Sequence, residues 1–228
     1  AAFRSSRVTG VTIGNNVTTI GDNAFYGCAQ MKYVKIPESV ISIGKAAFQT
    51  CYQLNNVVIP EGVTVLADSL FAYCRALSDL TIPQNITSIE YNALNSCSAL
   101  TEFDIPDTVT SVGEMAFFGC TGLERVSVGA SVESIGISAF RNCTNLAQVE
   151  FSDSGALRTI GEEAFFGCAA LQSVDLPEGL ESIGNKCFND CTSLSKATLP
   201  DSLESLGQFA FTDTVIYNAV QEAEGTYV

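Results

Sequence analysis

The cysteines are the residues of this sequence with the most reactive side chains. Nine are present among 228 residues, and there is no histidine. Cysteines form disulfides, bind metals or act as nucleophiles, but a nucleophilic thiol is often activated by a histidine, and many zinc sites combine the two. Because histidine is absent, the sequence excludes Cys–His catalysis, a Ser-His-Asp triad, an imidazole metal site and an imidazole pH switch.

Eight of the nine cysteines are evenly spaced, at intervals of 23 residues with one interval of 25. They are Cys28, Cys51, Cys74, Cys97, Cys120, Cys143, Cys168 and Cys191. Even spacing is typical of a tandem structural repeat, not of a disulfide framework or a metal site. Cysteines of adjacent repeats would lie within disulfide range, but their side chains would all point toward the core. We therefore predict buried, unreactive free thiols, with Cys187 in a core position that alanine usually fills.

Carboxylates are the second group that could do chemistry. The 25 Asp and Glu residues against 11 Lys and Arg give a net charge of −14. Several directly follow a proline, namely Glu38, Glu61, Asp107, Glu178 and Asp201. Such a row could bind Ca²⁺, and paired carboxylates can hydrolyse glycosides, but the sequence contains no calcium-loop motif and indicates no cleft. We interpret the row as solvated turns, and we expect no enzymatic activity, no metal and no cofactor.

The acidic balance also bears on partners. Nucleic acids and anionic membranes are bound through Lys and Arg, so a net charge of −14 argues against both. No apolar stretch approaches the length of a membrane span, and we expect no membrane insertion.

The repeated unit reads C-x-x-L-x-x-V-x-I-P-x-x-V-x-x-I-G-x-x-A-F-x-x. The V-x-I alternation predicts a short strand with one buried face, which the proline ends. The V-x-x-I-G segment predicts a second extended stretch that turns at the glycine, where a positive φ costs little. Ala, Phe and Cys at i, i+1 and i+4 predict a single helical turn. One unit cannot bury its apolar side chains alone, whereas stacked units can, so the pattern predicts a solenoid with parallel pairing between rungs.

Nine units of this kind fit the chain. We predict a solenoid over residues 1–213, with nine repeats starting at Ser5 in the cysteine position. Two extra residues fall within 152–156, a polar loop. Residues 214–228 are expected to form a degenerate C-terminal rung or cap, because Thr214 replaces the cysteine and Tyr217 the leucine. Since the sequence begins with Ala1 and not Met, we expect a processed chain or an excerpt of a longer protein.

The unit resembles the BspA-like leucine-rich repeat, also called the Treponema-pallidum-type repeat. Residues 171–191, LQSVDLPEGLESIGNKCFNDC, follow that pattern almost position by position. The resemblance implies a leucine-rich-repeat solenoid, a β-rich right-handed superhelix with a parallel sheet on its concave face. It also implies a secreted or cell-surface protein used in adhesion or protein binding. Gly129 in a proline position and Leu94 in a phenylalanine position depart from the pattern, and each affects a single rung.

The resemblance places ligands on the concave strand face, so the candidate binding residues are the outward-facing ones of the first strand of each unit. They are Tyr33, Lys35, Asp79, Glu102, Asp104, Arg125, Gln148, Glu150 and Asp175. The expected partner is a protein or glycan on a host or neighbouring cell. The row is polar, carries mixed charge and holds one aromatic ring, so a solvated face without a ligand is the alternative.

A second function stays open from the sequence. Exposed end rungs would allow copies to stack end to end into a filament, through a contact that does not close on itself. The three sequons at Asn16, Asn85 and Asn142 would carry glycans only in a eukaryotic secretory setting.

Overall fold

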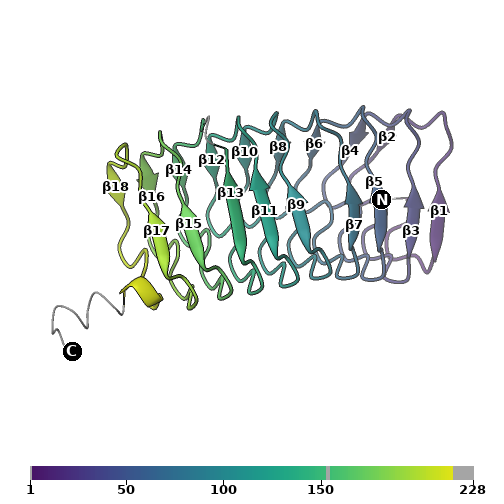
Figure 1. The fold of residues 1–228 in the computed structure, drawn as a ribbon. Coiled ribbons are helices and arrows are strands. Elements are labelled where there is room, and N and C mark those ends of the chain that lie inside the picture. The colour runs from purple at the N-terminus through teal and green to yellow at the C-terminus, as the bar shows by residue number, and fades with distance from the viewer. Residues whose placement is uncertain (1, 153–154, 218–228) are drawn as a thin grey trace.

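A computed structural model describes residues 2–152 and 155–217, which form a parallel β-solenoid with almost no helix (Figure 1). Each rung holds a longer strand, a shorter strand and a turn segment that leads into the next rung. The longer strands are β1 (Gly10–Thr12), β3 (Tyr33–Lys35), β5 (Asn56–Val58), β7 (Asp79–Thr81), β9 (Glu102–Asp104), β11 (Arg125–Val128), β13 (Gln148–Phe151), β15 (Ser173–Asp175) and β17 (Lys196–Thr198). The shorter strands are β2 (Thr19–Ile20), β4 (Ser42–Ile43), β6 (Val65–Leu66), β8 (Ser88–Ile89), β10 (Ser111–Val112), β12 (Ser134–Ile135), β14 (Thr159–Ile160), β16 (Ser182–Ile183) and β18 (Ser205–Leu206).

Equivalent strands of successive rungs pair in parallel, and the predicted fold class is confirmed. Val11 lies opposite Val34 and Val126 opposite Val149, each one repeat apart. The longer strands divide into three sheets, β1-β3-β5-β7, β9-β11-β13 and β15-β17. The shorter strands run without interruption from β6 to β18, and they keep their pairing across the 25-residue rung. The apolar residues of all rungs form one continuous core from Ile20 to Ala210.

The turn segments differ from the predicted helical turns. In the second rung, Ala24, Tyr26 and Cys28 donate their N–H groups to carbonyls three residues earlier, on Gly21, Asn23 and Phe25. The intervening N–H groups, such as that of Phe25, donate forward to carbonyls of the following rung. A helix would satisfy every N–H locally and could not form this ladder. The segment is therefore a run of three-residue turns that alternates local bonds with bonds to the next rung.

The repeated glycines also act differently from the prediction. A positive φ is found two residues later, as at Met115 after Gly113 and at Lys186 after Gly184, and not at these glycines. A Cβ atom on Gly113 would lie 2.6 Å from the backbone carbonyl carbon of Glu90 in the preceding rung. The glycine therefore permits close approach of adjacent rungs, which is a separate reason for lacking a side chain.

All nine cysteines are buried and free, as predicted. The eight evenly spaced thiols also make a contact that the sequence did not reveal. Each Sγ donates to the backbone carbonyl of the residue in the phenylalanine position one rung earlier, for example Cys51 to Phe25 at 3.2 Å and Cys120 to Leu94 at 3.1 Å. Burial raises the pKa of Cys51 and Cys120 to about 12, which keeps the donor proton in place.

Phenylalanine rings stack along the core beside the cysteines. The rings of Phe117 and Phe140 have centroids 4.9 Å apart and lie nearly parallel. Leu94 interrupts the stack, and Phe103 from β9 packs edge-on against Phe117 with centroids 5.0 Å apart. The smaller residue in one rung is thus compensated by a larger one in a neighbouring position.

The first rung corrects a predicted boundary. Ser6, and not Ser5, occupies the cysteine position, because its N–H donates to Phe3 as that of Cys28 donates to Phe25. The connection to β1 is therefore one residue shorter than in other rungs. At the other end, buried Thr214 accepts the N–H of Tyr217 at 3.1 Å, an N-cap contact for the helical turn at residues 215–217. The predicted cap of residues 214–228 otherwise lies outside the described residues.

Candidate functional site

The nine predicted binding residues all lie on the outward side of the longer strands, which we call the long-strand face. In most of these strands the exposed fraction alternates, with an inward residue between two outward ones, because successive side chains point to opposite sides of a sheet. The alternation puts one pair of outward positions on each rung. The role of these residues in binding stays a prediction.

The structure brings four of the predicted residues together around one guanidinium group. Arg125 Nη2 is 2.8 Å from Asp104 Oδ1 and 3.7 Å from Glu102 Oε2, while its Nη1 is 3.7 Å from Glu150 Oε2. Ser127 also donates to Asp104 at 2.7 Å. These bonds, the one from Ser127 first, lower the pKa of Asp104, and the carboxylates raise the pKa of Arg125. The cluster spans β9, β11 and β13 and joins three rungs.

The same arrangement recurs three rungs later, between β15 and β17. Thr198 donates to Asp175 Oδ1 at 2.6 Å, and Lys196 Nζ lies 3.2 Å from the same oxygen. The hydrogen bond from Thr198, followed by that from Lys196, lowers the pKa of Asp175. In both places an aspartate of one rung is held by a hydroxyl and a cation of the next rung.

The remaining predicted residues do not join a cluster. Asp79 accepts a hydrogen bond from Asn56 of the neighbouring strand. Tyr33 is 55% exposed, and Lys35 forms no ion pair within the described residues. The N-terminal part of the long-strand face is therefore a row of separate side chains.

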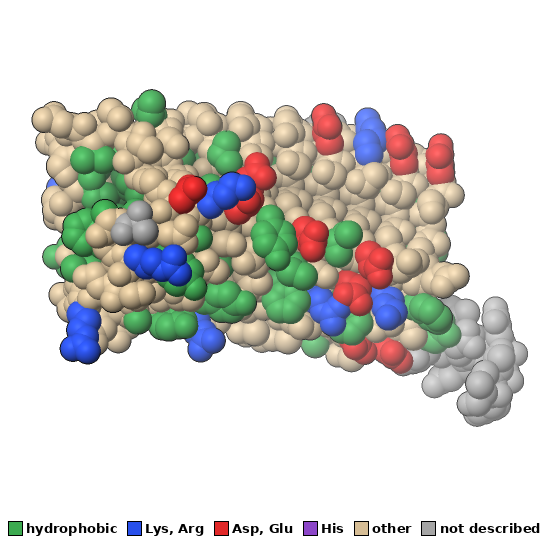
Figure 2. All heavy atoms as spheres, turned by 180° about the vertical axis from the view of Figure 1, so that it is seen from behind, with side chains coloured by type: hydrophobic (Ala, Val, Ile, Leu, Met, Phe, Trp, Pro, Cys, Tyr) green, Lys and Arg blue, Asp and Glu red, His purple; other side chains and the backbone are tan. Residues whose placement is uncertain are grey.

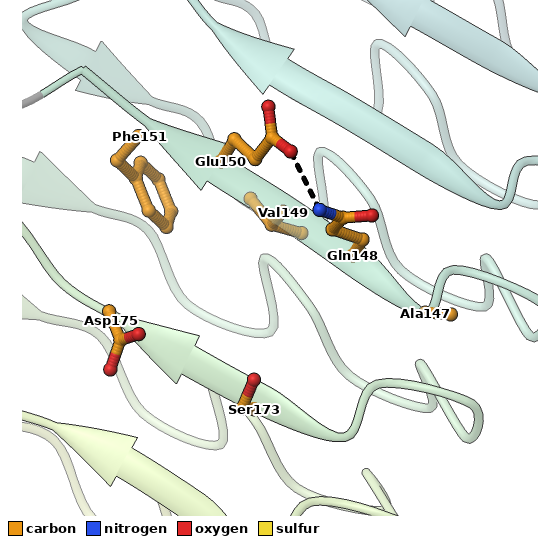
Figure 3. A pocket seen from close by; sticks show the side chains of 7 residues that line it. All are labelled: Ala147, Gln148, Val149, Glu150, Phe151, Ser173 and Asp175. Atoms are coloured by element: carbon orange, nitrogen blue, oxygen red, sulfur yellow. Dashed lines mark hydrogen bonds between the residues drawn. The ribbon is translucent and has the colours of Figure 1, made fainter.

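A groove opens where the long-strand sheet is interrupted between β13 and β15 (Figure 3). It has a volume of about 270 Å³ and is lined by Ala147, Gln148, Val149, Glu150, Phe151, Ser173 and Asp175. Gln148 donates to Glu150 at 2.6 Å across its upper wall, while Asp175 and Ser173 lie on the opposite strand. Three of the predicted residues, Gln148, Glu150 and Asp175, thus share one hollow.

Two features of this groove were missed by the reasoning from sequence. Phe151 follows the outward residue Glu150 in a position that is apolar in every rung, yet it is only half-buried and lines the hollow. The sheet break itself was also not foreseen. The available signal was the two-residue insertion, which follows Phe151 directly in the only 25-residue interval.

The groove combines acceptor oxygens with an apolar wall. A volume of about 270 Å³ is at the lower end of small-molecule sites, so it suits one side chain of a larger partner. Within the described residues no group of three or more Cys, Asp and Glu side chains is arranged to hold a metal ion. In the same part of the chain, no helix is long and apolar enough to cross a membrane.

A parallel β-solenoid with a 23-residue rung and a leucine and phenylalanine core defines a leucine-rich-repeat protein. The family model described as the BspA type leucine rich repeat region matches residues 1–124 and 116–227, in six copies. The chain belongs to this family. Repeat proteins of this kind are generally non-enzymatic scaffolds that bind proteins.

The chain is also similar to solved structures, and the first of those described below has the same fold. The leucine-rich-repeat protein of T. pallidum is 20% identical with a TM-score of 0.55, over 95% of this chain and 84% of that one. A leucine-rich-repeat protein from Bacteroides ovatus is 28% identical with a TM-score of 0.45, over 94% and 79% of the two chains. A leucine rich cell surface protein from Faecalibacterium prausnitzii is 29% identical with a TM-score of 0.45, over 90% and 76%. No curated protein matches the chain.

Proposed function

We propose that this protein is a non-enzymatic recognition module that binds a protein partner through the long-strand face. The observation that carries the proposal is the groove between β13 and β15. It lies beside the two-residue insertion of the 25-residue interval, and it gathers Gln148, Glu150 and Asp175 in one hollow. In a protein built from near-identical rungs, a local departure from the pattern is the place to look for function.

The chemistry of the groove suits a basic side chain. Glu150 and Asp175 offer carboxylate oxygens on opposite strands, and Phe151 offers an apolar surface for a methylene stem. Arg125 lies 3.7 Å from Oε2 of Glu150, and Gln148 donates to Oε1 at 2.6 Å. Each carboxylate oxygen can accept a second hydrogen bond, so a cation in the hollow could still bind this group. A lysine or arginine of a partner would bridge the two strands where the sheet hydrogen bonds are missing. Charge complementarity of this kind sets orientation and partner choice more than total affinity.

The setting of this activity is also part of the proposal. We infer a secreted or cell-surface location and a role in adhesion, which membership of the family supports. A host or neighbouring cell would supply the partner.

The experiment uses a short oligolysine peptide as the probe, with ¹⁵N-labelled protein followed by NMR. The amide shifts of residues 148–151 and 173–175 should move before those of other acidic segments. The double variant Glu150→Gln with Asp175→Asn should remove this response. The matched control, Glu38→Gln with Glu61→Gln, removes two exposed carboxylates elsewhere and should leave the response intact. Equal shifts at all carboxylates, or an unchanged response in the groove variant, would contradict the proposal.

A second candidate function is stacking of copies end to end. The first described rung has an apolar hollow of about 380 Å³ that includes Phe3, Val11 and Phe25, and the last exposes Leu206 and Phe209. Within the described residues, the N–H groups of Phe209 and Phe211 have no acceptor, whereas their equivalents in earlier rungs bond to the next rung. A second copy would supply both the apolar cover and the acceptors. Sedimentation velocity tests this: a monomer at every concentration up to the millimolar range would refute stacking, and Phe209→Ser should weaken any assembly.

A further inference from the structure

The corner of the solenoid around the cysteines has a different composition from the rest of this acidic protein. We consider the segment from two residues before each evenly spaced cysteine to three residues after it. In the seven rungs from Cys28 to Cys168, these segments contain no Asp or Glu. None of the 25 carboxylates of the chain belongs to these seven segments, which together form a strip along most of the solenoid.

The N-terminal part of this strip carries arginines and tyrosines. The guanidinium of Arg4 lies 4.6 Å from the ring centroid of Tyr26, and that of Arg75 lies 5.5 Å from the ring centroid of Tyr52. Tyr52 is 44% exposed and Tyr73, beside Arg75 in sequence, is 36% exposed. We call Arg4, Tyr26, Tyr52, Tyr73 and Arg75 the corner patch. It spans the first four rungs, on a side of the rung separate from the long-strand face.

The charge around the corner patch is positive although the protein is not. Residues 1–75 hold six of the 11 Lys and Arg residues but four of the 25 Asp and Glu residues. Within residues 2–75, which the structure describes throughout, Lys45 is the cation that pairs with a carboxylate. Figure 2 shows the result from behind: the lower left part, in the N-terminal half, shows green and blue side chains and no red ones. The net charge of −14 therefore does not describe this surface.

The backbone at the patch holds large residues in a conformation that disfavours them. Tyr73 has φ of 65° and Thr50, one rung earlier, has φ of 61°. The same position is glycine in three other rungs, at Gly27, Gly119 and Gly167, each with positive φ. Ser96, Asn142 and Asp190 share this conformation at the same position, so the fold sets it in each rung, and a tyrosine is costly there compared with glycine or asparagine. Glycine would suit the fold better at position 73, so the tyrosine side chain needs another explanation.

We propose that the corner patch binds a carboxylate-bearing polysaccharide. Arginine forks recognise carboxylates through two parallel hydrogen bonds, and the exposed parts of the Tyr52 and Tyr73 side chains offer apolar surface for sugar rings. Hydroxyl and amide side chains, such as Thr50 and Gln53, continue the strip and match sugar hydroxyls. An acidic peptide would be expected to add main-chain hydrogen bonds, but the turn backbone here already bonds within and between rungs. The site is separate from the groove of the proposed function and does not depend on it.

The experiment measures binding of oligogalacturonate by calorimetry at low ionic strength. Oligogalacturonate should bind, and its fully methyl-esterified form, which lacks the charge, should bind at least about tenfold more weakly, as expected for the loss of charged hydrogen bonds. Oligoglutamate of equal charge is the control for nonspecific electrostatic attraction between a polyanion and the patch. Equal binding of oligoglutamate, equal binding of the methyl ester, or no binding of oligogalacturonate would each overturn the proposal.

Two variants separate binding from folding. Tyr73→Gly should weaken oligogalacturonate binding roughly tenfold while leaving the thermal midpoint unchanged or higher, because glycine removes the backbone strain. Arg75→Ala should weaken binding to a similar extent. The matched control Tyr33→Ala removes an exposed tyrosine from the long-strand face and should bind as the parent does. A Tyr73→Gly protein that binds normally, or that binds less only because it unfolds, would refute the role of the patch.

Discussion

Two ladders of ionisable groups run along this solenoid, and they behave in opposite ways. The thiols lie inside, where burial raises the pKa of Cys51, Cys120 and Cys191 to about 12. The carboxylates of the long-strand face lie outside, where hydrogen bonds from hydroxyls and cations lower the pKa of Asp104 and Asp175. The thiols recur in every rung from Cys28 to Cys191, whereas carboxylates of the long-strand face occur on β7, β9, β13 and β15. The comparison shows that the repeat fixes where a group stands, while access to water decides its protonation.

The ladders also differ in how well they tolerate irregularity. The buried side keeps its spacing through the two-residue insertion, and β14 pairs with both neighbours. The long-strand sheet is interrupted between β13 and β15 in the same region. The long-strand sheet is also interrupted between β7 and β9, and the shorter strands between β4 and β6, where the repeat interval is regular. At the insertion the shorter strands stay paired, and the long-strand sheet opens into a groove.

The largest expected effect is alkaline unfolding. A thiol whose folded pKa is raised contributes stability that is complete below its ordinary pKa of 9.0 and is lost as pH rises toward about 12. Each such thiol costs about 1.4 kcal/mol per pH unit above 9, and Cys51, Cys120 and Cys191 together cost about 4 kcal/mol at pH 10. With the other buried thiols acting in the same direction, the fold should be lost within one to two units of pH 9. Urea unfolding at pH 8 and pH 10 measures the loss.

Cys120→Ala provides the control for this prediction. It lowers stability at pH 8 but removes one titrating group, so the loss between pH 8 and pH 10 should shrink by about 1.4 kcal/mol. A free energy of unfolding that is constant to pH 10.5 would show that the thiols are not protected as described.

The next largest effect concerns the ring stack beside the thiols. Phe140 is fully buried between Phe117 and Phe165, with centroids 4.9 and 5.1 Å away. Phe140→Ala should reduce the free energy of unfolding by about 3–5 kcal/mol, through lost burial and the cavity left behind. Tyr33→Ala on the exposed side should change it by less than about 0.5 kcal/mol. Chemical denaturation measures both variants. Equal losses of unfolding free energy for Phe140→Ala and Tyr33→Ala would contradict the difference expected between the buried core and the long-strand face.

A smaller effect is expected from crowding between rungs. Gly113→Ala would place a Cβ atom 2.6 Å from the backbone of Glu90 and should destabilise the fold by about 1–3 kcal/mol. Gly14→Ala is the matched control, because no atom lies within 4 Å of its Cβ position. Thermal unfolding of both proteins gives the comparison. A Gly113→Ala protein as stable as the control would mean that the rungs can separate slightly.

The smallest effect is at the acidic end of the pH range. The lowered pKa of Asp104 contributes stability above its ordinary value of 3.8, and this is lost as pH falls through the lower folded pKa. Since the group is mostly exposed, the contribution should stay under about 1 kcal/mol. Ser127→Ala removes the main hydrogen bond and should shift the Asp104 titration, followed by ¹³C NMR, back toward 3.8. If the pKa of Asp104 did not change in this variant, the hydrogen bond and ion pair with Arg125 would be the cause of its lowering.

The solenoid could be predicted from the sequence because the same pattern of apolar positions recurs in every unit. Every rung repeats the same apolar positions, so the fold follows from the burial that stacking allows, and the outward positions follow from strand alternation. The turn geometry could not be predicted in the same way. Whether an N–H bonds within its own rung or to the next depends on the packing distance between rungs, and the thiol bond to the phenylalanine carbonyl depends on the same distance. The groove and the corner patch involve side chains from neighbouring rungs, so they require the inter-rung register that the structure supplies.

The forward-pointing hydrogen bonds of the turn segments have an electrostatic consequence. In each turn from Asn23 to Asp190, three N–H groups donate to the next rung, and none of these segments donates backward through them. The peptide dipoles of this column are therefore aligned, with carbonyl oxygens toward the first rung and N–H groups toward the last. As in a helix, negative charge is stabilised near the N–H end and positive charge near the carbonyl end. The basic first third and the acidic remainder of the chain lie in that sense along the turn column. N–H groups beside the shorter strands, such as those of Ile41 and Gly44, donate backward to the preceding rung, so the polarity belongs to the turn side of the solenoid and not to its whole axis.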